Sequence, residues 1–252
     1  MAVDDPSGLR AFKADLHIHT CLSPCGDWEM SPRDVIRRSR EAGLDLIAVC
    51  DHNSSENAGA AMREGARAGL AVLPGMEVCT REEVHLLALF ENLSQALAMQ
   101  EFVYTGLPGE NQPEVFGYQV VANEENEVVC ENSRLLIGAT HHSLEQVVRR
   151  THALGGLSVS AHVDRPANGI INQLGFIPPD LELDAVEISY RIPLAQARER
   201  FPLIGGLPCI TSSDAHFLKD IGRAATLFRL AAPSLREIGL ALRAEQGRGV
   251  LS

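Results

Sequence analysis

No apolar run in this sequence of 252 residues approaches the roughly 20 residues that a helix needs to cross a bilayer. The first ten residues are acidic and polar, unlike the apolar core of a secretory signal. The six cysteines are scattered, without the density of a small disulfide-stabilised protein. We therefore expect a cytoplasmic protein with no membrane segment.

Basic residues are also scarce, because 22 Lys and Arg residues face 33 Asp and Glu residues, for a net charge of -11. An acidic chain lacks the basic surface with which proteins bind nucleic acid in general. This balance argues against a stable nucleic-acid scaffold, but not against an enzyme whose metal ions meet a phosphate. No Walker or dinucleotide-binding glycine pattern is present, so we expect no organic cofactor.

Short apolar strands alternate with helix patterns along the chain. Residues 44–50, for example, form a buried type of strand after a helix that Ser31 and Pro32 would cap. Such alternation predicts parallel βαβ units and an α/β fold. Residues 104–136 are polar and rich in Glu and Asn, which predicts an insertion with a hairpin and no second domain. We expect a single domain over residues 1–252.

Residues that commonly bind metals follow several of these strands. His17 and His19 end the first strand, and strand residues two apart face the same side. Imidazole is a common ligand of Zn, Fe, Mn and Co, although a single His-x-His pair is weak evidence. The pattern recurs at the ends of later strands, at Asp51-His52, Glu77, His162 and Asp214 with His216. In a β/α barrel these strand ends share the rim that carries the active site.

In their order along the chain, these segments resemble the motifs of the PHP (polymerase and histidinol phosphatase) superfamily. The matching segments are Asp15–Thr20, Cys50–His52, Pro74–Glu77, the strand with His85, Ala161-His162 and Ser213–His216. The resemblance implies a distorted TIM-like barrel of seven β/α units. It also implies a metal-dependent phosphoesterase with two or three divalent metal ions in a cleft at the rim.

The resemblance further implies which side chains hold these metals. Three sets are expected: His17, His19, Glu77 and Asp214; Glu77 as a bridge to His85 and His162; and His52 with His216. In relatives, a His or Asp from the loop after the first histidine pair completes the third set, whereas here Cys25 stands at that position with Asp27 nearby. A thiolate favours Zn or Fe over Mn or Mg. A Cys/His site, a site completed by Asp27 and a weak site remain open, with Zn, Mn or Fe as the expected metal.

The reaction implied by the resemblance is hydrolysis of a phosphate mono- or diester by a hydroxide that bridges the metals. A carboxylate-bridged pair of cations neutralises phosphate charge and lowers the pKa of a bound water. The substrate would be a nucleotide, a short oligonucleotide or a small phosphorylated metabolite. Arg165 is a candidate phosphate clamp, because guanidinium matches phosphate with two N–H groups, or else a solvated or ion-paired arginine. The sequence does not predict the oligomeric state.

Two other functions remain as alternatives. An amidohydrolase-type metal hydrolase also carries His-x-His on its first barrel strand, and a decayed site would leave a non-catalytic metal-binding module. Among the neighbouring acidic residues, Asp15 and Asp51 would orient histidines, or Asp51 would instead be a ligand or a cap. Glu187 reads as structure at the rim, and His152, in the middle of a predicted helix, as a residue without a role in the site.

Overall fold

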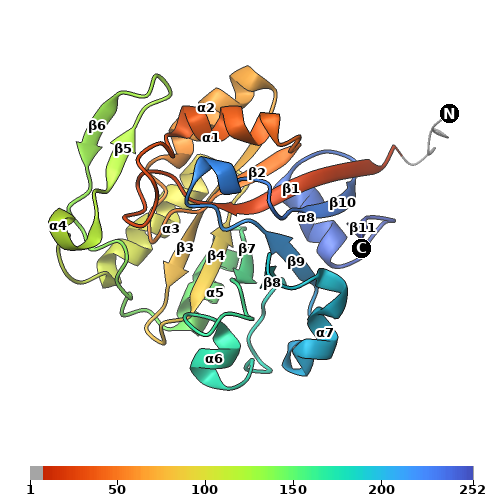
Figure 1. Ribbon diagram of the computed structural model, residues 1–252. Helices are drawn as coiled ribbons and strands as arrows, with labels where there is room; N and C mark the ends of the chain where they lie inside the picture. Colours follow the sequence, from red (N-terminus) through yellow and green to blue (C-terminus); the bar gives the residue numbers. More distant parts are fainter. Residues whose placement is uncertain (1–7, 252) are drawn as a thin grey trace.

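The computed structural model describes residues 8–251 (Figure 1). The predicted absence of a secretory signal concerns a segment whose first seven residues lie outside this range. Nine strands form one sheet in the order β11-β10-β1-β2-β3-β4-β7-β8-β9. Their bounds are β1 (Arg10–Ile18), β2 (Leu46–Val49), β3 (Ala71–Cys79), β4 (His85–Leu89), β7 (Leu157–Ser160), β8 (Ala185–Ser189), β9 (Cys209–Ser212), β10 (Thr226–Leu230) and β11 (Gly249–Leu251).

The seven strands from β1 to β9 curl into a nearly closed barrel. The sheet closes where Ile18 at the end of β1 forms a parallel bridge with Ala215, just after β9. Inside, Leu46, Leu87 and Ile210 belong to a fully buried apolar cluster. Each such leucine stabilises the fold by about 1.5–3 kcal/mol relative to an exposed one. The predicted α/β fold with a distorted barrel is confirmed.

Helices cover the outside of the barrel (Figure 1). The longer ones are α1 (Pro32–Glu41), α2 (Ala58–Ala68), α3 (Leu93–Gly106), α5 (Leu144–Ala153) and α8 (Leu235–Leu242). Short turns of helix are α4 (Pro113–Phe116), α6 (Ile170–Leu174), α7 (Ala197–Arg200), η1 (Leu194–Gln196), η2 (Pro202–Ile204) and η3 (Leu218–Asp220). As predicted, Ser31 caps α1 by accepting the Asp34 N–H. Within residues 8–251, no helix combines the length and apolar character needed to cross a bilayer.

Strand β4 departs from the predicted parallel arrangement, because it is antiparallel to both β3 and β7. A tight turn joins β3 to β4, in which Thr80 N–H donates to the Val84 carbonyl at 2.9 Å. So short a connection allows only an antiparallel pair, since a parallel crossover needs a dozen or more residues. Its reversed direction puts the first residue of β4, His85, at the rim where the parallel strands end.

A β-bulge in β1 turns the side chains of His17 and His19 toward the inside of the barrel. From Asp15 to Ile18, β1 advances three residues while its partner β2 advances two. The extra residue changes which side chains face inward, since a bulge breaks the alternation of a strand. Leu16, before the change, packs in the apolar cluster inside the barrel. His17 and His19, after it, turn toward the same interior at the rim.

The polar segment 104–136 forms the predicted hairpin, with β5 (Val120–Ala122) and β6 (Val128–Glu131). Buried Asn57 fastens it to the barrel, donating to the Val120 carbonyl at 3.0 Å and accepting the Ala122 N–H at 2.9 Å. Gly117, with φ +99°, approaches the loop of residues 20–30 so closely that a Cβ there would lie 2.3 Å from the Pro24 carbonyl oxygen. The insertion therefore lies directly against this loop.

Candidate active site

Glu77 is at the centre of the side chains that gather at the rim. Its Oε1 lies 2.8 Å from His85 Nδ1 and 3.0 Å from His162 Nε2. Its Oε2 lies 3.1 Å from His52 Nδ1. Glu77 does not follow its strand as predicted, but lies within β3, which continues through Pro74 and Gly75 to Cys79. One carboxylate thus contacts histidines from three other segments of the chain.

Asp214 lies beside the histidine pair of β1. Its Oδ1 is 3.4 Å from His17 Nε2 and 3.2 Å from His19 Nε2. Both Nε2 atoms are also 3.4 Å from Glu77 oxygens. The ring of His216 stacks on that of His19 with centroids 4.1 Å apart. The predicted residues from all five strand ends, with His85 from β4, therefore meet in one cluster.

The cluster favours positive charge. Burial alone would raise the pKa values of Glu77 and Asp214, but His85 and His17 outweigh it and hold both well below their usual range. Burial opposes protonation of His17, yet the carboxylates of Glu187, Asp214 and Glu77 raise its pKa well above the ordinary value. Buried carboxylates in such number stabilise a proton or another cation at this position.

Hydrogen bonds behind the first histidine pair fix how the two rings face the cluster. His17 Nδ1 lies 3.2 Å from both oxygens of Glu187, which can only accept. His19 Nδ1 lies 2.9 Å from Ser23 Oγ, whose own proton goes to Asp51 at 2.7 Å. Both Nδ1 atoms therefore carry protons, and in neutral rings both Nε2 atoms present lone pairs.

These two Nε2 atoms are only 3.1 Å apart. Two lone pairs at this distance repel each other unless a positive charge lies between them. The donor set of His17 and His19 therefore fits a metal ion, and metal-binding histidines commonly have such an acceptor behind the ring. Ligand atoms within 4.8 Å of one another form three groups: His17, His19 and Glu77; His52, Glu77 and His85; and His19, His52 and His216. The clusters are consistent with several divalent cations.

The loop after the first histidine pair offers a thiol to the third group. The pKa of the exposed Cys25 thiol is lowered to about 6, because the interactions with His52 and His216 outweigh the cost of desolvation. The Asp27 carboxylate instead stabilises the loop itself, because it accepts the Glu29 N–H at 2.9 Å. Of the two residues considered for this position, Cys25 is the one that interacts with these histidines.

Arg165 reaches the cluster from the loop after β7. Its Nη1 lies 2.5 Å from Asp214 Oδ2, the oxygen that faces away from the first histidine pair. Its buried Nε has no hydrogen-bond partner within residues 8–251. His162 and Asp214 have φ values of +28° and +48°. Each of these left-handed residues costs about 1–3 kcal/mol and turns a side chain back over the rim.

Glu187, expected from the sequence to be structure at the rim, lies within β8 behind the first histidine pair. It is fully buried, and besides His17 it accepts the His162 N–H at 3.2 Å. The signal was present, because Glu187 lies two residues after Ala185 and so shares the inward face of β8. Asp51 caps the loop through Thr20 and reaches a histidine only through Ser23.

Asp15 and His152 have structural contacts instead of a place in the cluster. Asp15 accepts N–H groups from Ser213 and Gly222, so it fastens the backbone instead of orienting a histidine. His152 lies outside the cluster and pairs with Asp184 at 2.8 Å.

Comparisons with known proteins agree with this geometry. The profile of the family described as PHP domain matches residues 15–168, and the one described as PHP-associated matches residues 204–246. An uncharacterized protein of Methanocaldococcus jannaschii is 30% identical over 101 residues, which are 36% of this chain and 59% of that protein. The 5'-3' exoribonuclease Rnm of Salmonella typhimurium is 32% identical over 94 residues, 35% of this chain and 31% of that enzyme. The chain thus spans about three fifths or less of these relatives.

Solved structures share the fold. The lesion-specific endonuclease PfuEndoQ from Pyrococcus furiosus superposes with a TM-score of 0.72 at 18% identity, covering 96% of this chain and 58% of that one. A protein inferred to be a metal-dependent phosphoesterase, from Bifidobacterium adolescentis, superposes with a TM-score of 0.55 at 22% identity, covering 81% and 87%. At these identities, the likeness establishes the barrel alone.

Proposed function

Because the chain belongs to the PHP domain family, we propose that it is a metal-dependent phosphoesterase that hydrolyses phosphate esters of nucleotides or short oligonucleotides. One observation carries the proposal: the Nε2 atoms of His17 and His19 lie 3.1 Å apart beside Glu77, in a group of ligand atoms that could hold a cation. A relative named as an exoribonuclease supports a nucleic-acid ester over another metabolite. The whole of residues 1–252 would form one catalytic domain, with the insertion at its rim.

The proposed metal ligands are those predicted from the sequence. They are His17, His19, Cys25, His52, Glu77, His85, His162, Asp214 and His216. When bound there, two or three divalent cations would neutralise phosphate charge and lower the pKa of a water molecule. The Cys25 thiol favours Zn or Fe over Mn for the third position.

The protein's own groups would position the substrate and the ligands. Glu187 and Ser23 hold the protons on the far nitrogens of His17 and His19, so the near nitrogens stay available as ligands. Arg165 lies at the edge of the cluster with its Nε unpaired, which suits it to bind a phosphate oxygen. The surplus of acidic residues keeps general nucleic-acid binding weak, so contacts at the site would select the substrate.

The test replaces both His17 and His19 with Ala and compares the variant with His141→Ala, which removes an exposed histidine outside the cluster. Metal content of protein purified without chelator is measured together with phosphate release from mononucleotides, short oligonucleotides and amide substrates. We expect the double variant to lose metal and at least about 100-fold of its hydrolysis, as removal of metal ligands should. Full metal-dependent phosphate release by the double variant would contradict the proposal. Hydrolysis of amides alone would favour the amidohydrolase alternative, and metal binding with no hydrolysis the non-catalytic one.

A further inference from the structure

The one tryptophan of the chain is unusually exposed. Trp28 has 71% of its surface accessible, whereas large aromatic side chains are normally well buried. It lies in the loop of residues 20–30, three positions after Cys25. The loop is closed at its base by the Cys21 N–H, which donates to the Met30 carbonyl at 2.8 Å. One short, tied loop thus carries both a thiol of the metal cluster and a free indole.

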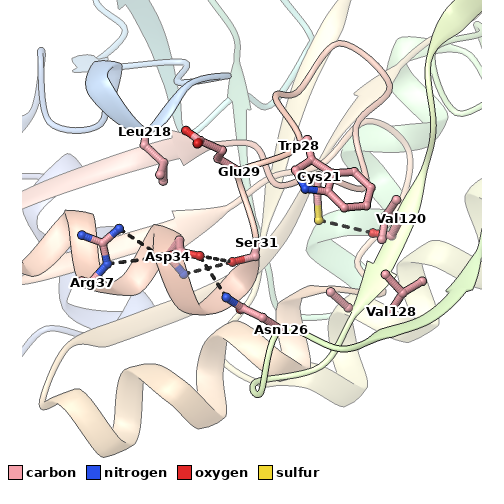
Figure 2. Close-up of a pocket in the computed structure, with 11 residues that line it drawn as sticks. Cys21, Trp28, Glu29, Ser31, Asp34, Arg37, Val120, Asn126, Val128 and Leu218 are labelled. Carbon is pink, nitrogen blue, oxygen red and sulfur yellow. Dashed lines mark hydrogen bonds and ion pairs between the residues drawn. The ribbon is translucent and has the colours of Figure 1, made fainter.

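Trp28 lies over a pocket of about 390 Å³ between this loop, the start of α1 and the β5–β6 hairpin. Figure 2 shows the indole beside Cys21 and Val120, with the polar groups at the other end of the pocket. There, Asn126 donates to Asp34 at 3.0 Å. The pocket therefore has an apolar aromatic end and a polar end with a carboxylate.

The pocket borders chain segments that also carry residues of the candidate active site. Leu218, which lines it, follows His216 by two residues. The Asp27 N–H, beside Trp28, donates to the His216 carbonyl at 2.8 Å. A ligand lying on Trp28 would therefore occupy the far side of the same short segments that present Cys25 and His216 to the metals.

The charges in the pocket disfavour a phosphate. Glu29, Asp34 and Arg37 line it, but Arg37 is already paired with Asp34 at 3.0 Å and with Glu41 at 3.0 Å. A flat ring with N–H groups on its edge suits such a pocket better, because the ring can stack on the indole while the edge donates to a carboxylate. Nucleobases have this chemistry, and a pocket of this volume accommodates a nucleoside.

We propose that this pocket binds a nucleobase of a single-stranded nucleic-acid substrate, stacked on Trp28, next to the phosphate held at the metal cluster. The inference rests on the proposed function and adds to it the part of the substrate that is recognised. Stacking matters here because an acidic chain gains little affinity from the nucleic-acid backbone. Replacing an aromatic side chain on which a base stacks with Ala typically weakens binding about 5- to 150-fold.

The direct test uses the fluorescence of Trp28, which reports on this site alone because the chain has no other tryptophan. Protein in EDTA, excited at 295 nm, is titrated with pentaadenylate and with a matched abasic pentanucleotide. We expect saturable quenching by pentaadenylate only. No quenching, or equal quenching by both, overturns the inference. Since no catalysis is needed, this result stands whether or not the enzyme hydrolyses phosphate esters.

A kinetic test separates base binding from catalysis. Trp28→Ala should lower kcat/KM for pentaadenylate about 5- to 150-fold while leaving the hydrolysis of ribose 5-phosphate unchanged. Trp28→Phe should restore most of the loss, and Tyr118→Ala, an exposed aromatic control outside the pocket lining, should have no effect. Equal loss on both substrates overturns the inference. Dimerisation through Trp28 would also overturn the inference. It would appear as a shift of Trp28 emission with protein concentration, together with a doubled mass in light scattering.

Discussion

Replacing Glu187 with Gln tests whether a buried carboxylate behind the first histidine pair controls metal binding. The native carboxylate accepts from two donors, His17 Nδ1–H and the His162 backbone N–H, both at 3.2 Å. The Gln amide keeps one accepting oxygen, but its NH₂ donor then replaces the other oxygen, which also lies 3.2 Å from His17 Nδ1. Either a donor faces a donor, or His17 changes tautomer and its Nε2 then carries a proton where the metal should bind.

Both outcomes weaken the same ligand. Loss of an acceptor behind a metal-binding histidine typically lowers metal affinity or activity about 10- to 100-fold. We expect the metal concentration for half-maximal hydrolysis to rise by this factor in Glu187→Gln, which corresponds to about 1.4–2.7 kcal/mol. The assay follows phosphate release as Zn or Mn is added back to protein stripped with chelator, and reads metal content in parallel.

The control is Glu182→Gln, which removes the same charge from an exposed side chain five residues earlier. It should leave the metal requirement unchanged. Thermal unfolding of both proteins without metal shows whether the Glu187 variant is folded. If folded Glu187→Gln needs no more metal than the wild type, the reasoning from tautomers is wrong.

Three further predictions concern metals and charge. Removal of metal should lower the melting temperature by about 5–10 °C, because a ligand at 100 times its Kd stabilises the fold by about 2.7 kcal/mol; an unchanged melting curve in EDTA would argue against bound cations. Cys25→Ser should release zinc at lower chelator concentration, since a hydroxyl is a poorer zinc ligand than a thiolate; unchanged zinc retention would remove Cys25 from the site. The hydrogen bond to Asp184 raises the pKa of His152, so this pair stabilises the fold fully below pH 6.5 and loses its effect as the pH rises through the raised value. Urea unfolding should therefore show a larger cost of His152→Ala at pH 5.5 than at pH 8.5, by less than about 1 kcal/mol for a partly exposed pair, and an equal cost would refute this.

The pattern of polar residues at strand ends was enough to predict most of the cluster. That pattern works because parallel strands in a barrel end at one rim, so residues far apart in the chain meet there. His85 did not fit it, since it begins its strand instead of following one. The short connection from Cys79 to His85 was the available signal, because no parallel crossover is that short.

Other features depend on contacts that no local pattern reveals. Ser54 and Ser55 look like the start of a helix, but α2 begins at Ala58. Both hydroxyls form hydrogen bonds with groups distant in the sequence. The Ser55 hydroxyl donates to the Gly75 carbonyl at 2.7 Å, and the Ser54 hydroxyl lies 2.8 Å from the Tyr104 hydroxyl. The facing nitrogens of His17 and His19 likewise require Glu187, which lies about 170 residues further along the chain.

The barrel closes between the two chain segments that carry His17, His19 and Asp214. His17 and His19 stand on one side of the join between β1 and β9, and Asp214 on the other, with the His19 N–H donating to the Ala215 carbonyl at 3.0 Å. A cation bound by all three would link the two strands across this join. Local opening of the barrel between β1 and β9 would then require release of the ion, and the rate of hydrogen exchange at the His19 amide would report both events.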